Sequence, residues 1–316
     1  RRRGRSAAAR SGRYRVLSAE LRRPAALLAI LLAITAVVGL ATVRSQRPKA
    51  APPLIMAFTP SRDPAALQGA ADAFVSLLSQ LSGVPVRAQV ASDYAGVIEA
   101  LRSRRVDLAF VHPVGYVLAR QEAGCDILVR DVWQDRTAYK ASFYVRKDKG
   151  IERLEDLRGR TIAFVDPASS SGYIYPMVLL IKRGLVQNRD PKTFFKEALF
   201  AGTHDAALRA LLQGRVDAAT TFDRAPQIHL KDPALEGQLV AIAETPDIPE
   251  AGICARPGLP APQVLALKQA LLSMKRPDHA AVLKDIYDID GFVVGKDADY
   301  DPVRDALSLM DYRPKR

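Results

Sequence analysis

The sequence predicts a two-lobed α/β protein preceded by an N-terminal transmembrane helix, and three observations support this prediction. Residues 24–43 form an uncharged run directly after an Arg-rich segment. Beyond this run, short apolar stretches alternate with segments of helical periodicity, the pattern of α/β folds with largely parallel sheets. The alternation occurs as two sets in one chain of 316 residues, a length that suits two domains of ordinary size.

The positive charge of the chain is concentrated at its beginning. Residues 1–23 hold nine Arg and one Glu, a net charge of +8, which leaves +4 of the total of +12 for the rest. The rest shows no Lys/Arg stripe with interleaved aromatic residues, so no nucleic-acid partner is expected. The basic segment suits the cytoplasmic side of a membrane, because positive charge is retained there.

The uncharged run over 24–43 has the length of a membrane span. At 1.5 Å per residue it reaches about 30 Å, the thickness of the hydrocarbon core. The apolar part of a removable signal peptide is shorter, about 7–15 residues. We therefore favour an uncleaved signal anchor over a removed signal peptide, with 1–23 in the cytoplasm. The body is expected on the periplasmic side, tethered by a single-pass helix and a polar linker over 44–52.

The elements of the body follow one another in a regular order. In the first set we expect strands over 54–58, 84–90, 106–111, 127–129 and 141–146, with helices over 65–81, 94–103 and 114–122. In the second set we expect strands over 161–165, 195–200 and 216–220, with helices over 173–183 and 205–212. A short helix over 224–230 can follow the last strand.

One local device occurs in both sets. Residues 98–109 and 208–219 each read as a helix, a short turn and a strand that begins Val-Asp-x-Ala. Ligands in open α/β sheets bind beyond the carboxyl ends of the strands. Residues 112–113 and 221–223, which come after these two strands, are therefore expected to line one cleft between the lobes.

The segment DPASSSGY, residues 166–173, lies between a predicted strand and a predicted helix. The start of a helix leaves backbone N–H groups unpaired and carries partial positive charge. One interpretation is a single capping serine with two neighbours that have no special role. The other is an anion site formed by the three hydroxyls and the free N–H groups.

The remaining chemistry-bearing residues are few. Cys125 and Cys254 could pair in an oxidising compartment or remain as two buried thiols, and their spacing does not decide between the two. The four His residues lack metal-ligand spacing and no C-x-x-C motif occurs, so we expect no metal and no cofactor.

Four motifs resemble those of one known family. Residues 93–98 resemble its D-Y-A-x-hydrophobic segment, and 166–172 its D-P-x-S-[ST]-S-G loop. Residues 202–208 resemble G-x-H-[DE]-x-A-hydrophobic, and 216–219 follow at the expected distance. The chain is thus similar, over about 53–295, to the periplasmic phosphate/phosphite/phosphonate-binding proteins, the substrate-binding components of ABC importers.

This resemblance implies a clamshell of the type II periplasmic-binding-protein fold. Lobe 1 would comprise 53–139 and the return segment 248–316 with its C-terminal helices, and lobe 2 would comprise 140–247. The ligand would be phosphate, phosphite or a phosphonate, delivered to an ABC permease. The residues implied as ligand-binding are Ser169, Ser170, Ser171, His204, Tyr94, Tyr139 and Asp223. The first four would hold the oxyanion, the two tyrosines would close over it, and Asp223 would face its substituent.

The chain departs from the family pattern at 249–252. Aminophosphonate binders carry an Asp near the position of Ala251, where this chain has Glu250 one residue away. Recognition of an amine is therefore in doubt, and smaller ligands remain open.

Two other functions have some support in the sequence. Ser170, His204 and Asp223 occur in the order of a catalytic triad, but no G-x-S-x-G elbow is present and three adjacent serines suit binding better, so no enzyme is expected. The alternative is a membrane-tethered ligand sensor of the same fold that signals to a membrane partner.

Overall fold

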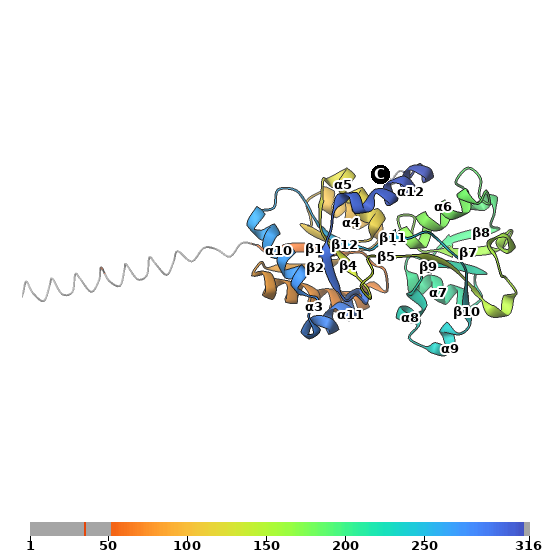
Figure 1. Ribbon diagram of the computed structural model, residues 1–316, viewed down its shortest axis with the longest axis horizontal. Coiled ribbons are helices and arrows are strands. Elements are labelled where there is room, and N and C mark those ends of the chain that lie inside the picture. Colours follow the sequence, from red (N-terminus) through yellow and green to blue (C-terminus); the bar gives the residue numbers. More distant parts are fainter. Residues whose placement is uncertain (1–34, 36–51, 313–316) are drawn as a thin grey trace, which may run out of the picture. The chain divides into compact units, whose positions relative to one another are not determined.

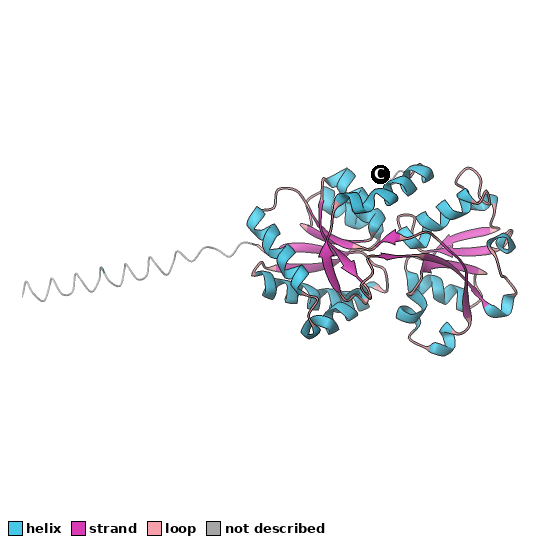
Figure 2. Ribbon diagram, viewed as in Figure 1, coloured by secondary structure: helices cyan, strands magenta, loops and turns pink. Residues whose placement is uncertain are grey.

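The computed structural model describes residue 35 and residues 52–312, and residues from 53 onward form one compact unit. That unit holds two main β-sheets flanked by helices (Figures 1 and 2). We call the six-stranded sheet with its helices the first lobe and the five-stranded sheet with its helices the second lobe. The predicted membrane segment 24–43 lies outside the described residues, apart from residue 35. Within the described part of the chain, no helix has the length and apolarity needed to cross a bilayer.

The first lobe is built on the strand order β13-β4-β12-β3-β1-β2. Its strands are β1 (Leu54–Phe58), β2 (Val86–Val90), β3 (Leu108–Val111), β4 (Asp126–Val132), β12 (Gly252–Ala255) and β13 (Gly291–Val294). Its helices are α3 (Pro64–Ser82), α4 (Tyr94–Arg102), α5 (Pro113–Ala123), α10 (Ala261–Ser273), α11 (Ala280–Tyr287) and α12 (Asp301–Met310).

The second lobe is built on the order β10-β6-β9-β7-β8. Its strands are β6 (Ala141–Arg146), β7 (Thr161–Phe164), β8 (Glu197–Phe200), β9 (Ala218–Phe222) and β10 (Leu239–Glu244). Its helices are the π-helix η3 (Ser170–Ile174), α6 (Tyr175–Lys182), α7 (His204–Leu212), α8 (Ala225–Leu230) and α9 (Pro233–Glu236). Short 3₁₀ turns complete both lobes: η1 (Lys147–Lys149), η2 (Leu154–Leu157), η4 (Pro191–Thr193), η5 (Pro277–His279) and η6 (Asp297–Tyr300).

The two lobes are joined by a pair of crossing segments. These segments contain β5 (Ala138–Tyr139) and β11 (Ile248–Pro249), which pair with each other antiparallel. The next strands along the chain, β6 and β12, each enter a lobe from this crossing.

The expectation of largely parallel sheets is wrong for half of each sheet. Parallel pairing is confined to β2-β1-β3 in the first lobe and β8-β7-β9 in the second. The strands β6 and β12 arrive from the opposite direction and pair antiparallel with β9 and β3. The parallel units come from local strand–helix–strand repeats, whereas these antiparallel strands follow from the double crossing between lobes.

The predicted helices over 65–81 and 94–103 are confirmed to within about one residue. Both begin at an aspartate whose side chain accepts a hydrogen bond from the first turn: Asp63 from the N–H of Ala66, and Asp93 from that of Gly96. The helix expected from residue 173 begins earlier, as the π-helix η3, and continues as α6.

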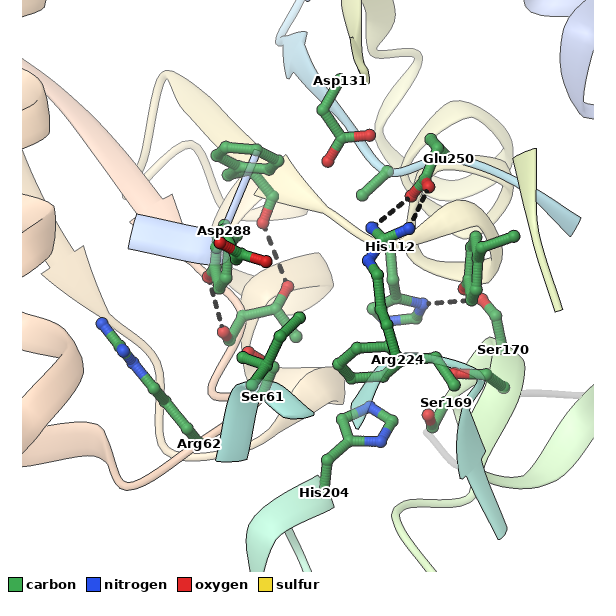
Figure 3. Close-up of a pocket in the computed structure, with 18 of the residues that line it drawn as sticks. Ser61, Arg62, His112, Asp131, Ser169, Ser170, His204, Arg224, Glu250 and Asp288 are labelled. Atoms are coloured by element: carbon green, nitrogen blue, oxygen red, sulfur yellow. Dashed lines mark hydrogen bonds and ion pairs between the residues drawn. The ribbon is translucent and has the colours of Figure 1, made fainter. Parts of the chain in front are cut away.

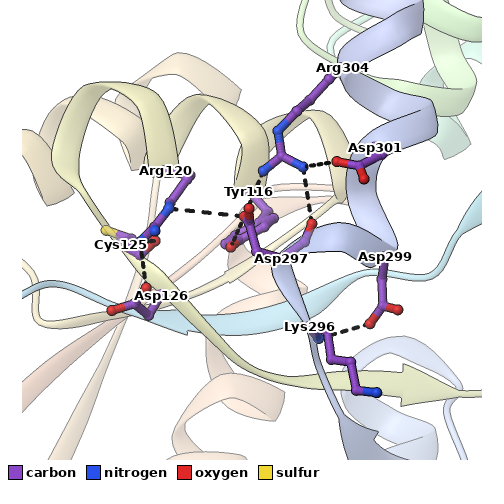
Figure 4. A network of polar contacts seen from close by, with 9 residues as sticks. All are labelled: Tyr116, Arg120, Cys125, Asp126, Lys296, Asp297, Asp299, Asp301 and Arg304. Carbon is purple, nitrogen blue, oxygen red and sulfur yellow. Dashed lines mark hydrogen bonds and ion pairs between the residues drawn. The ribbon is translucent and has the colours of Figure 1, made fainter.

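The C-terminal helix α12 packs against both lobes. It contacts α5 of the first lobe and α6 of the second. Its start is held by a polar network (Figure 4), in which Asp297 accepts hydrogen bonds from the Tyr116 hydroxyl and the Arg304 guanidinium, both at 2.6 Å. Near its end, the Leu309 carbonyl accepts a hydrogen bond from Arg189 Nε at 2.8 Å. This helix therefore lies across the junction between the lobes.

Candidate functional site

A cavity of about 130 Å³ lies between the two lobes (Figure 3). Part of its wall comes from residues at or just beyond the carboxyl ends of the parallel strands β1, β3, β7, β8 and β9. The rest comes from β4, the crossing segments, and the helices α4, α8 and α11. A cavity of about 150 Å³ is known to hold a benzene molecule, so this space suits a ligand of only a few non-hydrogen atoms.

The serine loop after β7 is folded tightly against the strand. Asp166 shapes the turn, because its side chain accepts from the Ala168 N–H at 2.7 Å and its carbonyl accepts from the Ser169 N–H at 2.9 Å. Gly172 allows the close approach: a Cβ at this position would lie 2.4 Å from the Cβ of Val165. The carbonyl of Gly172 accepts from the Thr220 hydroxyl at 2.8 Å. The loop is thereby fixed to both β7 and β9.

The three serines of this loop are all buried, and each makes a different contact. Ser169 caps η3, since its Oγ accepts from the Gly172 N–H at 3.1 Å. Ser170 reaches the first lobe, where its Oγ accepts from the Val114 N–H at 3.0 Å. Ser171 lines the cavity with the other two and faces the Tyr139 hydroxyl. Capping by Ser169 and cavity lining by all three serines thus occur together in the segment DPASSSGY.

His112, at the N-cap of α5, is the partner of Ser170 in the first lobe. Its Nδ1 accepts from the Gly115 N–H and lies 3.2 Å from the Ser170 Oγ. Because Nδ1 accepts from a backbone N–H, it carries no proton, and the Ser170 hydroxyl donates to it. Burial lowers the pKa of His112 to about 3, so the ring is neutral.

His204 begins α7 and lies on the second-lobe side of the cavity. Its backbone N–H donates to the Ser61 carbonyl of the first lobe at 3.2 Å, and its Nδ1 lies 2.6 Å from Thr221 Oγ1. Its ring stacks parallel to that of His229 at 6.2 Å. Burial and then the neighbouring His229 lower the pKa of His204 well below its usual range, and burial lowers that of His229 to about 4. Both are therefore neutral hydrogen-bonding groups in the unliganded protein.

The two expected tyrosines also line the cavity. The ring of Tyr94 packs against that of His112 in a tilted arrangement, with ring centroids 4.7 Å apart. Burial, followed by the charge of Asp166, raises the pKa of Tyr94. The nearby hydroxyl of Ser169 partly opposes this rise in the pKa of Tyr94. Burial and the charge of Glu250 raise the pKa of Tyr139, and the nearby Ser171 hydroxyl partly opposes this rise. Both phenols stay protonated and can donate hydrogen bonds.

Asp223 is the one expected residue that does not line the cavity. Its Oδ1 accepts from the Arg224 N–H at 3.1 Å and its carbonyl accepts from the Tyr144 hydroxyl at 2.6 Å. The neighbouring side chain, Arg224, enters the cavity instead. The helix α8 begins at Ala225, one residue later than expected, and Arg224 is its N-cap residue.

Arg224 forms a bidentate ion pair with Glu250 inside the cavity (Figure 3). The distances are 2.8 Å from Nη1 to Oε1 and 3.3 Å from Nη2 to Oε2. Nearby Asp131 is buried, and its Oδ1 has no hydrogen-bond partner among the described residues. Burial, and then the charge of Glu250, raises the pKa of Asp131 well above its usual range.

Two further cations line the cavity on the first-lobe side. Arg62 donates to the Asp285 carbonyl at 2.6 Å, while its ion pair with the Asp285 carboxylate is long, at 4.0 Å. Lys284 is paired with Asp288 and Asp290 at 3.4 and 3.3 Å. Sequence reasoning did not identify Arg62, Arg224 or Lys284. Only Arg62 had a local signal for a place at the cavity, because it comes four residues after the predicted strand over 54–58.

The described residues show no group of three or more His, Cys, Asp or Glu arranged to hold a metal ion. Cys125 and Cys254, for which two states were open, are both buried free thiols.

Comparison with known families decides which fold family the chain represents. A family model described as the periplasmic substrate-binding protein of a phosphonate ABC transporter matches residues 56–300. The chain belongs to this family.

Two curated relatives of this family match about half of the chain. The phosphate-import protein PhnD of Mycolicibacterium smegmatis is 32% identical over 176 residues, which are 54% of this chain and 55% of that protein. The phosphonates-binding periplasmic protein of Escherichia coli is 28% identical over 182 residues, 56% of this chain and 52% of that protein. The chain thus matches these curated relatives over about half of their length.

Two solved structures share the fold over most of the chain. A binding protein component of an ABC phosphonate transporter from Pseudomonas aeruginosa has a TM-score of 0.75 and 25% identity, covering 82% of this chain and 87% of that one. PhnD1 from Prochlorococcus marinus, solved in complex with methylphosphonate, has a TM-score of 0.73 and 20% identity, covering 82% and 98%. The second likeness shows the fold alone.

Proposed function

We propose that this protein captures a phosphate, phosphite or phosphonate between its lobes and delivers it to an ABC importer. The observation that carries the proposal is the serine loop, which presents three buried hydroxyls and the start of a π-helix to a small cavity between the lobes. The family membership favours transport over signalling by a membrane-tethered sensor. No catalytic role is proposed.

The cavity supplies the hydrogen-bond donors that a tetrahedral oxyanion needs. The N–H groups of Ser170 and Ser171 precede the first bonds within the helix, and the helix dipole adds partial positive charge there. Hydroxyls of Ser169 and Ser171, the imidazole of His204, and the phenols of Tyr94 and Tyr139 surround the same space. Three or four charge-assisted hydrogen bonds, at about 1.5–3 kcal/mol each, could give binding of about −8 kcal/mol after the cost of association.

Six of the seven residues implied by the resemblance line the cavity, and two of the seven, Ser170 and Asp223, take roles in the proposal that differ from those expected. Ser169, Ser171 and His204 contact the oxyanion, and Tyr94 and Tyr139 close over it. Ser170 connects the second lobe to the first through its hydrogen bonds with the Val114 N–H and His112 Nδ1. Asp223 acts indirectly, because its contacts position Arg224 and the first turn of α8.

We also propose the arrangement of the whole chain. Lobe 1 comprises 53–139 and 248–316, lobe 2 comprises 140–247, and residues 24–43 anchor the body outside the cytoplasmic membrane. Protease added to cells with a permeabilised outer envelope should digest the body while sparing residues 1–23. A body that is cut only after the cells are lysed would refute this topology.

The binding proposal is tested by titration calorimetry against phosphate, phosphite, methylphosphonate and sulfate. Replacing Ser169, Ser170 and Ser171 together by Ala should abolish binding, since the lost donors of Ser169 and Ser171 cost about 1–3 kcal/mol each and the loss of Ser170 removes a contact between the lobes. The matched control is Ser76→Ala with Ser308→Ala, two exposed serines on α3 and α12. A folded triple variant that binds as tightly as the control would contradict the proposed site.

A further inference from the structure

The guanidinium of Arg224 lies among aromatic rings inside the cavity. Its Cζ is 4.6 Å from the ring centroid of Trp133, 5.8 Å from that of Phe222 and 6.0 Å from that of Tyr139. Aromatic faces within about 6 Å attract a cation through their quadrupoles, and such cages recognise ammonium groups in ligands. We call these three rings the aromatic cage.

Glu250 completes the cage with a buried carboxylate. Its side chain is 4% exposed and that of Arg224 is 11% exposed, so the ion pair is largely removed from water. A buried carboxylate beside aromatic faces is an arrangement that binds a positively charged group. In this protein the group is supplied by the chain itself. Arg136, which lies 4.5 Å from the Trp133 ring, adds a second cation at the edge of the cage.

The cage adjoins the proposed oxyanion site. Tyr139 borders both sites, because it lines the cavity together with Ser171 while its ring lies 6.0 Å from the Cζ of Arg224. Arg224, Glu250 and the three serines line the same cavity of about 130 Å³. A substituent that extends from the oxyanion toward Glu250 would have to occupy the space of the guanidinium.

We propose that Arg224 is a specificity-determining residue that acts as a built-in cation and excludes ligands with a positively charged substituent. This inference rests on the proposed function of the serine loop. The site then accepts oxyanions with no substituent or a small uncharged one, such as a methyl group. An aminoalkyl phosphonate is rejected for two reasons: its ammonium meets a cage that is already filled, and Arg224 repels it.

The test compares methylphosphonate with 2-aminoethylphosphonate by titration calorimetry. The wild type should bind methylphosphonate more tightly. In Arg224→Ala, the affinity for 2-aminoethylphosphonate relative to methylphosphonate should rise by about tenfold or more, because Glu250 and the rings become available to the ammonium. Arg224→Lys, which keeps a cation beside Glu250, should retain the wild-type ratio. Adding Glu250→Gln to Arg224→Ala should remove the gain.

Each other outcome counts against the inference. A wild type that binds both ligands equally, or an Arg224→Ala protein with an unchanged ratio, overturns it. Loss of all oxyanion binding in folded Arg224→Ala would show that the guanidinium holds the oxyanion itself, which also overturns it. Should Arg224→Ala fail to fold, Arg224→Gln, which can still hydrogen-bond to Glu250, must show the same rise. Failure of the proposed function would look different, since the wild type would then bind none of phosphate, phosphite and methylphosphonate.

Discussion

Ser170 offers a way to test whether the serine loop controls closure of the two lobes. Its Oγ accepts from the N–H of Val114, a residue with no exposed surface, and its hydroxyl donates to His112 Nδ1. These contacts connect the second lobe to the first turn of α5 in the first lobe. Replacing Ser170 by Ala therefore removes a hydrogen bond that exists only when the lobes are together.

The expected magnitude follows from the Val114 N–H. In the closed arrangement of Ser170→Ala this donor stays buried without a partner, at a cost of about 1–3 kcal/mol. In an open arrangement water would satisfy it, so the cost falls on the closed form alone. The equilibrium between closed and open forms should shift by about 5- to 150-fold, and the affinity for the oxyanion should fall within the same range.

Small-angle scattering and calorimetry measure the two effects together. The unliganded Ser170→Ala protein should have a larger radius of gyration than the wild type, and saturating ligand should reduce the difference. Thr220→Val is the matched control, because the Thr220 hydroxyl is equally buried but bonds to Gly172 within the second lobe. It should lower stability without changing the unliganded radius. Identical scattering and affinity for Ser170→Ala and the wild type would refute the role of this contact in closure.

Two further predictions concern the loop and the histidines. Gly172→Ala should lower the free energy of unfolding by about 1–3 kcal/mol and weaken oxyanion binding, because the new Cβ meets Val165. Urea denaturation measures the first effect and calorimetry the second, and wild-type values in both would contradict this prediction. Stability should also depend on pH through the buried histidines His112, His204 and His229, whose pKa values are lowered in the folded protein. Below about pH 6.5 these side chains take up protons in the unfolded chain but not in the folded protein. Each can therefore remove up to about 1.4 kcal/mol per pH unit on acidification, a contribution fully present above pH 6.5. Asp131 and Glu250, whose pKa values are raised, make the folded protein more stable on acidification and so oppose the histidines. The measurement is therefore the loss of unfolding free energy between pH 7 and 5 in the wild type and in His229→Asn. The variant should lose less. Equal losses in the two proteins would argue against a buried neutral His229.

The sequence alone located the parts of the site that depend on local structure. A serine loop between a strand and a helix could be recognised because strand ends and helix starts leave signals within a few residues. The position of these junctions at the carboxyl ends of parallel strands explains why Ser169–Ser171, His204 and Tyr94 line the same cavity. The expected roles of His204, Tyr94 and Tyr139 came from the family resemblance.

The tertiary structure alone decided which charges enter the cavity and how they are paired. Sequence reasoning put an acid at 223, but the backbone turns at the start of α8 so that Arg224 faces inward, where it meets Glu250 from the return crossing. The double crossing also made half of each sheet antiparallel, which local alternation of strands and helices could not reveal. The physical reason is the same in each case. Local signals report the hydrogen bonding and periodicity of neighbouring residues, whereas ion pairing and strand direction depend on segments brought together from distant parts of the chain.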